Sequence, residues 1–515
     1  MRSFMRSFMR SFMRSLLRER ASASSVPAAA WRFAVATLVL GVMIPLPATA
    51  QPTKPTPNTG TMLTSLDAAA ARYGDLAKQI WGFAEVGYME EKSSALLQAE
   101  LRGAGFTVTT GTAGEPTAFI AEYGSGKPVI AILGEFDALP GLSQDAVPER
   151  KVLRVGGPGH GCGHHLFGTA STAAAIALKA WMVANNVKGT LRMIGTPAEE
   201  GGAGKVYMVR DGIFNDVDAA IVWHPGDANE VDGGRSMANI SGKFRFHGLS
   251  AHAAASPERG KSALDAVEVM DVMTNFLREH IPDGSRIHYV ITNGGKAPNV
   301  VPDEAEVYYV VRHVDMNIVK DIWGKVVNAA KGAALGTGTT YDLQLVGSVY
   351  STLPNEVLAK LQQRALEKVG GFTYTADERA FAEKLQKSEA FTAVPLETTA
   401  RVKPLRMNEA GAGSTDVGDV SWVVPTIQMS AATWVPGTAA HSWQAVAAGG
   451  MSIGMTGMMV AAKTMALTGA DLFSTPATIV AAKAEFDAKR GPNFKYETVL
   501  GSQKPQLDYR KGSVP

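Results

Sequence analysis

The sequence has a single cysteine, Cys162, among its 515 residues. One cysteine excludes an internal disulfide, so this thiol is either a small buried side chain or a chemically active group. Positive and negative charges nearly balance, with a formal net charge of +2. Residues 1–50 hold seven arginines and one acid, a contribution of +6 that leaves −4 for the remaining chain. The main part of the chain therefore lacks a basic surface, and nucleic acid is not expected as a partner.

The N-terminal segment has no apolar run long enough to span a membrane. Its uncharged run covers residues 33–44, whereas a transmembrane helix needs about 20 residues. A basic stretch ending at Arg32 precedes this run, and small residues lead from it to Gln51. This order is typical of a cleavable secretory signal. We therefore expect export to the periplasm, cleavage near Ala50 and no stable membrane anchor, with the true initiator among the repeated MRSF units left open.

The remaining chain is long enough for two domains and has an ordinary apolar fraction of 46%. A Pro- and Thr-rich linker over residues 51–61 precedes strands that alternate with helices over 62–240, which predicts a three-layer α/β domain with a mainly parallel sheet. Residues 241–350 follow a β-α-β-β-α-β order, typical of an inserted ferredoxin-like α+β domain. Residues 351–515 are expected to complete the first domain and end in a tail.

Helices are expected at seven places with helical periodicity or helix-forming composition. These are residues 63–83, 90–103, 166–184, 262–278, 316–335, 354–369 and 375–388. The Ala-, Gly- and Met-rich run from residue 440 is apolar but interrupted by glycines. It is therefore interpreted as a buried helix of the first domain and not as a membrane span.

Polar residues follow three of the predicted strands where each strand ends. They are Glu135 and Asp137, the adjacent pair Glu199 and Glu200, and His224. Ligand sites in parallel α/β sheets gather beyond the carboxyl ends of the strands. The sequence therefore predicts one site at this edge of the sheet.

Several of these residue types are metal ligands. Cys162 and His164 lie two apart in the glycine-rich stretch GHGCGHH, so both side chains can converge on one ion at the start of a helix, where a thiolate is favoured. Of two adjacent acids, Glu200 can bind a cation while Glu199 stays free to move protons, although a solvated acid pair is the alternative. His224 and His441 would each be an ordinary core or surface histidine if taken alone. Together these residues supply enough N, S and O donors for two ions with one shared ligand or bridging water.

Eight short stretches carry a resemblance to a known family. They are GEFDALPGLSQ, GHGCGHHLFG, GTPAEEGGAGK, WHPG, GLSAHAAASPERGKSALDAV, APNVVPD, STDVGDVSW and GTAAHSW. In this order the sequence resembles the dinuclear metallopeptidases and amidohydrolases that include carboxypeptidase G, aminoacylases and auxin-conjugate hydrolases. Within them it is most similar to the aminobenzoyl-glutamate hydrolase branch, over about residues 60–470.

The resemblance implies a role for most of the polar residues above. The implied metal ligands are Cys162, His164, Glu200, His224 and His441. Glu199 matches the family's general acid/base, and Asp137 matches an aspartate that orients a ligand. Glu135 falls where the peptidase branch has a metal-binding histidine, so its ligation is left open. His165 stands where the family has Asp or Asn, and could be an added ligand or part of the pocket wall.

Three residues of the inserted domain are implicated in the same way. His252 matches the histidine that polarises the scissile carbonyl, and in relatives it reaches the active site of the partner subunit. Asn299 and Arg312 match substrate-binding positions, and the Arg312 guanidinium suits a carboxylate. A homodimer formed through the inserted domain is therefore implied, and whether His252 acts in cis or in trans stays open.

The resemblance implies a metal-dependent amidohydrolase that holds two divalent ions, zinc or manganese. It would cleave the amide bond of N-acyl or aminobenzoyl amino acids, a small-molecule substrate that bears a carboxylate. Two alternatives remain from the sequence. A dipeptidase, carboxypeptidase or N-acyl-amino-acid deacylase could use the same scaffold, and a non-catalytic periplasmic binding protein would require a broken set of ligands or acids.

Overall fold

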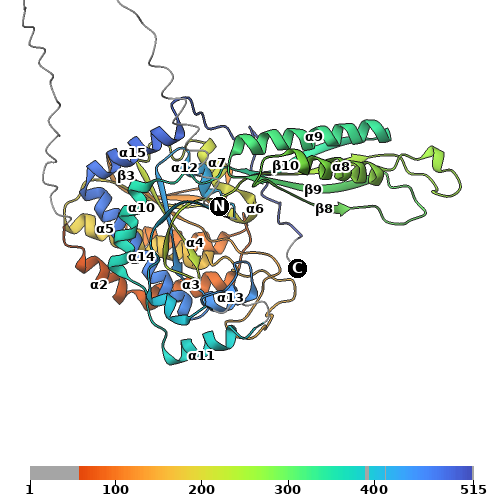
Figure 1. Cartoon of the computed structure of the whole chain (residues 1–515). Coiled ribbons are helices and arrows are strands. Elements are labelled where there is room, and N and C mark those ends of the chain that lie inside the picture. The colour runs from red at the N-terminus through yellow and green to blue at the C-terminus, as the bar shows by residue number, and fades with distance from the viewer. Residues whose placement is uncertain (1–56, 389–393, 412, 513–515) are drawn as a thin grey trace, which may run out of the picture. The chain divides into compact units, whose positions relative to one another are not determined.

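The computed structural model describes residues 57–388, 394–411 and 413–512 (Figure 1). The predicted export signal over residues 1–50 and the linker as far as residue 56 lie outside the described residues. The first helix, α2, begins at Gly60, so it includes the last two residues of the predicted linker.

A large mixed sheet forms the core of the described residues. In spatial order its strands are β1 (Thr107–Thr110), β2 (Phe119–Ser125), β4 (Gly189–Gly195), β3 (Val129–Gly134), β5 (Ala219–Gly226), β12 (Thr426–Ala432), β6 (Glu230–Arg235) and β11 (Arg406–Ala410). The central neighbours β4, β3, β5 and β12 pair in parallel, as do β6 and β11. The other pairs, β1 with β2, β2 with β4 and β12 with β6, are antiparallel. The predicted α/β class with a mainly parallel sheet is confirmed.

Helices cover this sheet and fill its core. They are α2 (Gly60–Ala68), α3 (Ala70–Phe83), α4 (Glu91–Gly103), α5 (His164–Ala184), α6 (Glu199–Gly202), α7 (Gly204–Arg210), α10 (Glu356–Val369), α11 (Ala376–Leu385), α12 (Val417–Ser421), α13 (Trp443–Gly449), α14 (Ser452–Ser474) and α15 (Pro476–Arg490). Short 3₁₀ turns occur at η1 (Thr112–Gly114), η2 (Pro257–Arg259), η3 (Arg278–His280) and η4 (Leu396–Ala400). The long helices α5 and α14 pack against each other and against β3 and β5. Their many alanines and glycines let the two backbones approach closely.

The apolar run from residue 440 forms α13 and α14, which are bent by 73° at the break between them. Within the described residues, α5 is long and apolar enough to cross a membrane, as the bent pair would be if counted as one span. However, 78% of the apolar window of α5 is buried inside the protein. Both features are therefore those of core helices packed on a sheet.

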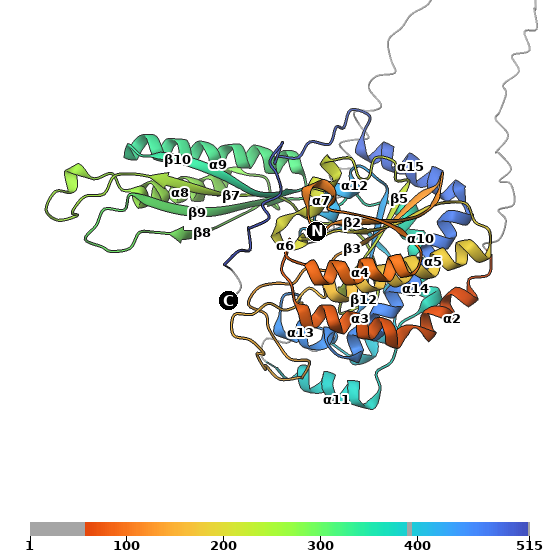
Figure 2. The same ribbon diagram turned by 180° about the vertical axis from the view of Figure 1, so that it is seen from behind.

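A second sheet is inserted between β6 and α10. Its strands are β10 (Thr340–Val349), β7 (Ala238–His247), β9 (Glu304–His313) and β8 (Arg286–Asn293), all antiparallel in this spatial order. Helices α8 (Ala263–Leu277) and α9 (Met316–Thr337) pack against each other and against β7 and β9 (Figure 2). The chain order is β-α-β-β-α-β and the core contains Phe244, Tyr309 and Trp323. The predicted ferredoxin-like insertion is confirmed.

Candidate metal centre

The carboxyl ends of the central parallel strands bring the predicted site together. β3 leads directly to Glu135 and Asp137, β4 leads to the short helix α6 with Glu199 and Glu200, and β5 contains His224 near its end. The loop before α5 and the loop after β12 lie at the same edge, since the backbone N–H of His441 donates to the Gly161 carbonyl at 2.9 Å. Five chain segments therefore meet at one place, as expected for a sheet of this topology.

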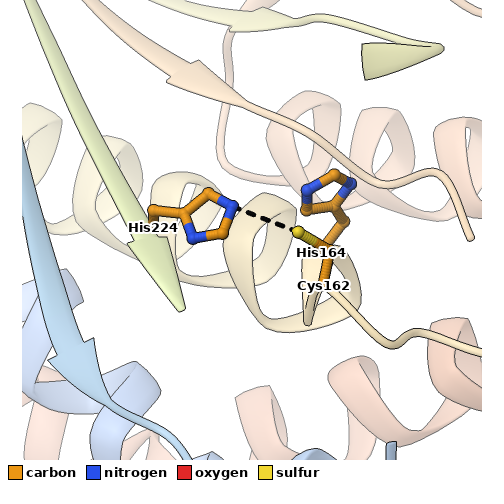
Figure 3. Close-up of side chains that lie close together, drawn as sticks. All are labelled: Cys162, His164 and His224. Carbon is orange, nitrogen blue, oxygen red and sulfur yellow. Dashed lines mark hydrogen bonds between the residues drawn. The ribbon is translucent and has the colours of Figure 1, made fainter. Parts of the chain in front are cut away.

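Two groups of three side chains there have the spacing of metal ligands. Cys162, His164 and His224 form one group, and Cys162, Glu200 and His441 form the other; within each group the candidate ligand atoms lie within 4.8 Å of one another. Figure 3 shows the Cys162 sulfur facing His224 and His164, with 3.3 Å between Sγ and the His224 Nε2. Cys162 belongs to both groups. The structure thus brings together all five residues predicted as ligands, in an arrangement with one shared thiol.

Hydrogen bonds fix the orientation of two of the histidines. The His164 Nδ1–H donates to Asp137 Oδ1 at 2.8 Å, and the His224 Nδ1–H donates to the Pro225 carbonyl at 2.7 Å. In both rings this arrangement leaves the Nε2 lone pair directed at the site, as metal-bound histidines require. The His164 Nε2 is buried and has no hydrogen-bond partner among the described residues. Mixed imidazole, thiol and carboxylate donors with an unsatisfied buried nitrogen fit divalent cations such as zinc.

Asp137 connects the two ligand groups. While its Oδ1 accepts from His164, its Oδ2 accepts the backbone N–H of Glu200 at 2.9 Å. Burial works to raise the pKa of this carboxyl, but the adjacent His164 brings it below its ordinary value. Asp137 is therefore placed to orient a ligand from each group and to make the His164 ring more basic.

The two adjacent glutamates differ in their acid–base behaviour. Burial raises the pKa of Glu199 well above its ordinary value, and the charges of Glu135 and Glu200 add to this shift. Burial also acts to raise the pKa of Glu200, but the hydrogen bond from His441 and the nearby His164 bring it below the ordinary value. Two neighbouring acids whose pKa values are moved apart are typical of a proton carrier beside a charged ligand.

The helix start does not favour a thiolate at Cys162, contrary to the expectation from the sequence. Cys162 is 7% exposed, and burial raises the pKa of its thiol far above the usual range despite the proximity of His164. Desolvation of the charged form outweighs the weak field of a helix N-terminus. A coordinated cation supplies the missing positive charge, because a thiol bound to such an ion is deprotonated.

Glu135 contacts both the site and a buried lysine that the sequence analysis missed. Its Oε2 lies 3.1 Å from the His164 Nε2, and its Oε1 lies 2.6 Å from the Lys205 Nζ. Lys205 is fully buried and also contacts Asp416 Oδ1 at 2.6 Å. Glu135 could complete a further group with His164 and Glu199, but one of its oxygens is already ion-paired. Lys205 and Asp416 stand in the motifs GTPAEEGGAGK and STDVGDVSW, so the signal was present without an assigned role.

His165 points away from both ligand groups. Its Nε2 lies 3.0 Å from the Gly449 carbonyl oxygen, and its ring lies 4.9 Å from that of His160. None of the three candidate ligand groups contains it. Among the two readings left open by the sequence, the structure favours a residue of the wall over an additional ligand.

A cavity of about 580 Å³ lies over the candidate ligands. One wall is the inserted sheet, where Tyr308, Val310 and Arg312 alternate along β9 and face the cavity together with Asn239 of β7. Arg312 donates from Nη1 to the Ser414 hydroxyl at 3.0 Å, while its buried Nε has no hydrogen-bond partner among the described residues. A guanidinium with an unused donor at the cavity wall suits a substrate carboxylate.

His252 and Asn299 are not brought to this cavity within one chain. Both are exposed, on neighbouring loops where the Ala253 N–H donates to the Asn299 carbonyl at 3.0 Å. These loops follow the end of β7 and precede the start of β9, whereas Arg312 is near the other end of β9. A ten-residue strand is about 30 Å long, so the two ends of the inserted sheet are that far apart.

Comparison with known proteins agrees with this geometry. Residues 131–444 match the model of peptidase family M20/M25/M40, and this range includes every candidate ligand. One of the two subunits of the p-aminobenzoyl-glutamate hydrolase of Escherichia coli strain K12 is 44% identical over 435 residues. The matched residues cover 79% of this chain and 90% of that protein.

Two solved structures share the fold. An aminobenzoyl-glutamate utilization protein from Klebsiella pneumoniae has a TM-score of 0.55 at 19% identity, covering 79% of this chain and 97% of that one. A dinuclear metal binding peptidase of the M20 family from Bacillus subtilis has a TM-score of 0.51 at 17% identity, covering 79% and 99%. At such identities the likeness shows the fold alone.

Proposed function

The chain belongs to the peptidase family M20/M25/M40 and is a hydrolase of amide bonds, and we propose that it cleaves aminobenzoyl-glutamate or a similar N-acyl amino acid with the help of two divalent cations. The observation that carries this proposal is the meeting of five ligand side chains in two groups that share Cys162, beside an unbound Glu199. No ligand or acid of the predicted set is missing, which argues against a non-catalytic binding protein.

The residues divide the chemistry between them. When bound, the cations would lower the pKa of a water molecule and polarise the substrate carbonyl. Glu199 takes a proton from the attacking water at its carboxylate and returns it to the leaving amide nitrogen. Its raised pKa lets it carry that proton between the two steps. The neutral imidazoles and Glu200 stay in place as ligands.

The cavity supports a substrate with a free carboxylate. Arg312 projects into it from β9 with a donor unused, and Asn239 on the neighbouring strand adds an amide. The relative that is 44% identical over most of the chain belongs to a p-aminobenzoyl-glutamate hydrolase, and the compound in that name carries carboxylates. This similarity favours an aminobenzoyl amino acid over a dipeptide. Zinc suits the Cys and His donors, and manganese is the alternative.

We propose that the protein is a homodimer that associates through the inserted domain. α8 exposes Val272 and Phe276, which are 51% and 72% exposed, and the edge strand β8 exposes Val290 at 55%. Such an apolar face beside an unpaired strand edge is typical of a protein interface. A second copy could bring its His252 and Asn299 to the cavity that this chain leaves without them. The Escherichia coli relative is itself named as a subunit of a hydrolase, which also supports an assembly of more than one chain.

Export to the periplasm is part of the same proposal, because residues 1–50 have the order of a cleavable signal. The measurement is the N-terminal sequence of the protein purified from the periplasm. Cleavage at the predicted position would give a chain that starts at Gln51.

The function is tested by hydrolysis of p-aminobenzoyl-glutamate and of the same compound with its α-carboxylate blocked as an amide. Release of p-aminobenzoate should stop after dialysis against a chelator and return with Zn²⁺ or Mn²⁺. Arg312→Met should raise KM for the free acid roughly 10- to 100-fold, because a hydrogen bond to a charged group contributes about 1.5–3 kcal/mol. It should affect the blocked compound little.

Arg286→Met is the matched control. Arg286 is the cross-strand partner of Arg312 but is exposed and does not line the cavity. Its KM should equal that of the wild type. Hydrolysis of neither compound by protein loaded with two metal ions would contradict the proposed substrate class, and full activity in the presence of the chelator would contradict the metal centre.

A further inference from the structure

Residues 491–512, here called the C-terminal strap, follow α15 without forming a further helix or strand. Figures 1 and 2 show this dark-blue segment running from α15 past the inserted sheet to the C mark. Its first part is anchored in the core. The Tyr496 hydroxyl donates to the buried Asp419 Oδ1 at 2.8 Å, and the ring of Phe494 lies 4.7 Å from that of Trp422.

The middle of the strap is tied to the inserted sheet. Gln503 and Gln506 both donate to the Leu345 carbonyl, at 3.2 and 2.9 Å. Leu345 lies where the register between β10 and β7 shifts. Leu500 packs with Val349 of β10 and with residues of α7. The strap therefore spans the junction between the inserted sheet and the segment that follows the two glutamates.

The end of the strap reaches a candidate metal ligand. The Tyr509 hydroxyl donates to the Glu200 carbonyl oxygen at 2.9 Å, and the Arg510 Nη2 donates to the same oxygen at 2.6 Å. The Tyr509 ring packs edge-on against Tyr88, with 5.7 Å between centroids. A Cβ at Gly87 would collide with the Tyr509 hydroxyl, so a glycine at this position leaves room for the strap.

The backbone that carries the two glutamates needs such support. Ala198 and Ala203 both have φ of +54°, a region that residues with a Cβ rarely adopt, and Gly201 between them has φ of +92°. Such a turn persists only when its surroundings determine it. Glu90 accepts the Ala198 N–H at 2.8 Å and Asp137 accepts the Glu200 N–H, while the two strap donors hold the carbonyl side of Glu200.

We propose that the C-terminal strap is a positioning element of the metal centre. By holding the Glu200 carbonyl, Tyr509 and Arg510 prevent rotation of the peptide between Glu200 and Gly201, which the glycine would otherwise permit. The Glu200 carboxylate is thereby kept beside His441 and Cys162, and Glu199 is kept over the cavity. Neither strap residue touches substrate or a cation, so both act through Glu200. This inference rests on the proposed function.

The test is a titration of the metal-free, full-length protein with Zn²⁺, followed by calorimetry or a competing chelator. Wild-type protein should bind two ions. Tyr509→Phe, which keeps the ring and removes the donor, and Arg510→Gln should each weaken one ion by about 10- to 100-fold, the usual effect of losing a residue that orients a ligand. The other ion, on Cys162, His164 and His224, should keep its wild-type affinity. In Co²⁺-loaded protein the visible spectrum of the weakened site should change.

Lys511→Gln is the matched control, because Lys511 is on the same strap but is exposed. It should bind both ions as the wild type does. Thermal unfolding of each metal-free variant separates positioning from folding, and the midpoints should stay close to the wild-type value. Wild-type affinities for both ions in Tyr509→Phe and Arg510→Gln would overturn the role of the strap alone. Failure of the wild type to bind Zn²⁺ would overturn the metal centre itself, and with it the inference.

Discussion

Glu199 and Glu200 are neighbours in the chain, yet their surroundings prepare them for different tasks. Glu200 receives His441 and lies in a ligand group, whereas Glu199 has carboxylates for neighbours and is biased toward its protonated form. An acid without a cation of its own can exchange protons with water and with a leaving nitrogen. The separation of roles therefore comes from what each side chain contacts, and not from the residue type.

Glu199→Gln should lower kcat by about 10²- to 10⁴-fold, because an amide cannot accept the proton of the attacking water. KM and the content of bound metal should change little, since Gln keeps the shape of the side chain and Glu199 is not in either Cys162 group. Steady-state kinetics with p-aminobenzoyl-glutamate and metal analysis check both statements. Glu304→Gln, at an exposed position of β9, is the control with wild-type kinetics. Near-normal turnover by Glu199→Gln would refute the role of this residue.

The sequence predicted the five ligands because each follows a strand or opens a helix within a recognisable short motif. It did not predict the contact between Lys205, Glu135 and Asp416, because a lysine in a sequence is usually a solvent-exposed residue. It also could not predict Tyr509 and Arg510, which lie 309 and 310 residues from Glu200 in the chain. Contacts of such separation leave no local pattern.

At the scale of elements, the short helix α12 connects the catalytic sheet to the strap through the buried Asp419. Burial raises the pKa of Asp419 to about 8, an effect that the hydrogen bonds from the Tyr496 hydroxyl and the Tyr350 N–H partly oppose. The nearby Asp416 raises it further. The folded protein thus keeps a proton on Asp419 at pH values where the unfolded chain has released it.

The free energy of unfolding of the metal-free protein should therefore fall as the pH rises from about 4 to 8. Below this window both states hold the proton, and above it neither does. Asp419→Asn mimics the protonated acid and should reduce the loss of stability across the window. Urea unfolding at pH 5 and pH 8 in the presence of a chelator measures the difference, with the exposed Asp303→Asn as a control. An equal pH dependence in wild type and Asp419→Asn would contradict the assignment.

Elements with clear periodicity were predicted well, and others were not. α5, α8, α9 and α10 begin and end within two residues of the expected bounds. β6 and β11 were not predicted, because EVDGGR and RMNEA lack the alternation of apolar and polar residues that marks a strand. These two strands are held by pairing with each other and with β12. Their formation depends on tertiary context that a local pattern does not contain.

At the scale of the whole molecule, the substrate-binding residues fall into two groups at opposite ends of the inserted sheet. Arg312 and Asn239 line the cavity of their own chain, whereas His252 and Asn299 are exposed about one strand length away. One chain alone therefore has the proposed metal centre without the residue expected to polarise the carbonyl. A dimer through α8 and β8 would solve this problem if each inserted domain served the other chain.

Mixed dimers test this arrangement directly. A chain with Glu199→Gln and a chain with His252→Ala should each be nearly inactive as homodimers. If His252 acts in trans, a mixed dimer has one complete site, formed by Glu199 of the second chain and His252 of the first. Random association of equal amounts should then restore about one quarter of the wild-type activity, because half of the dimers are mixed and each has one working site of two. If His252 acts within its own chain, mixing should restore none. Adding Phe276→Glu to both chains places a charge on the exposed face of α8 and should abolish the restoration, with a shift to monomer in sedimentation.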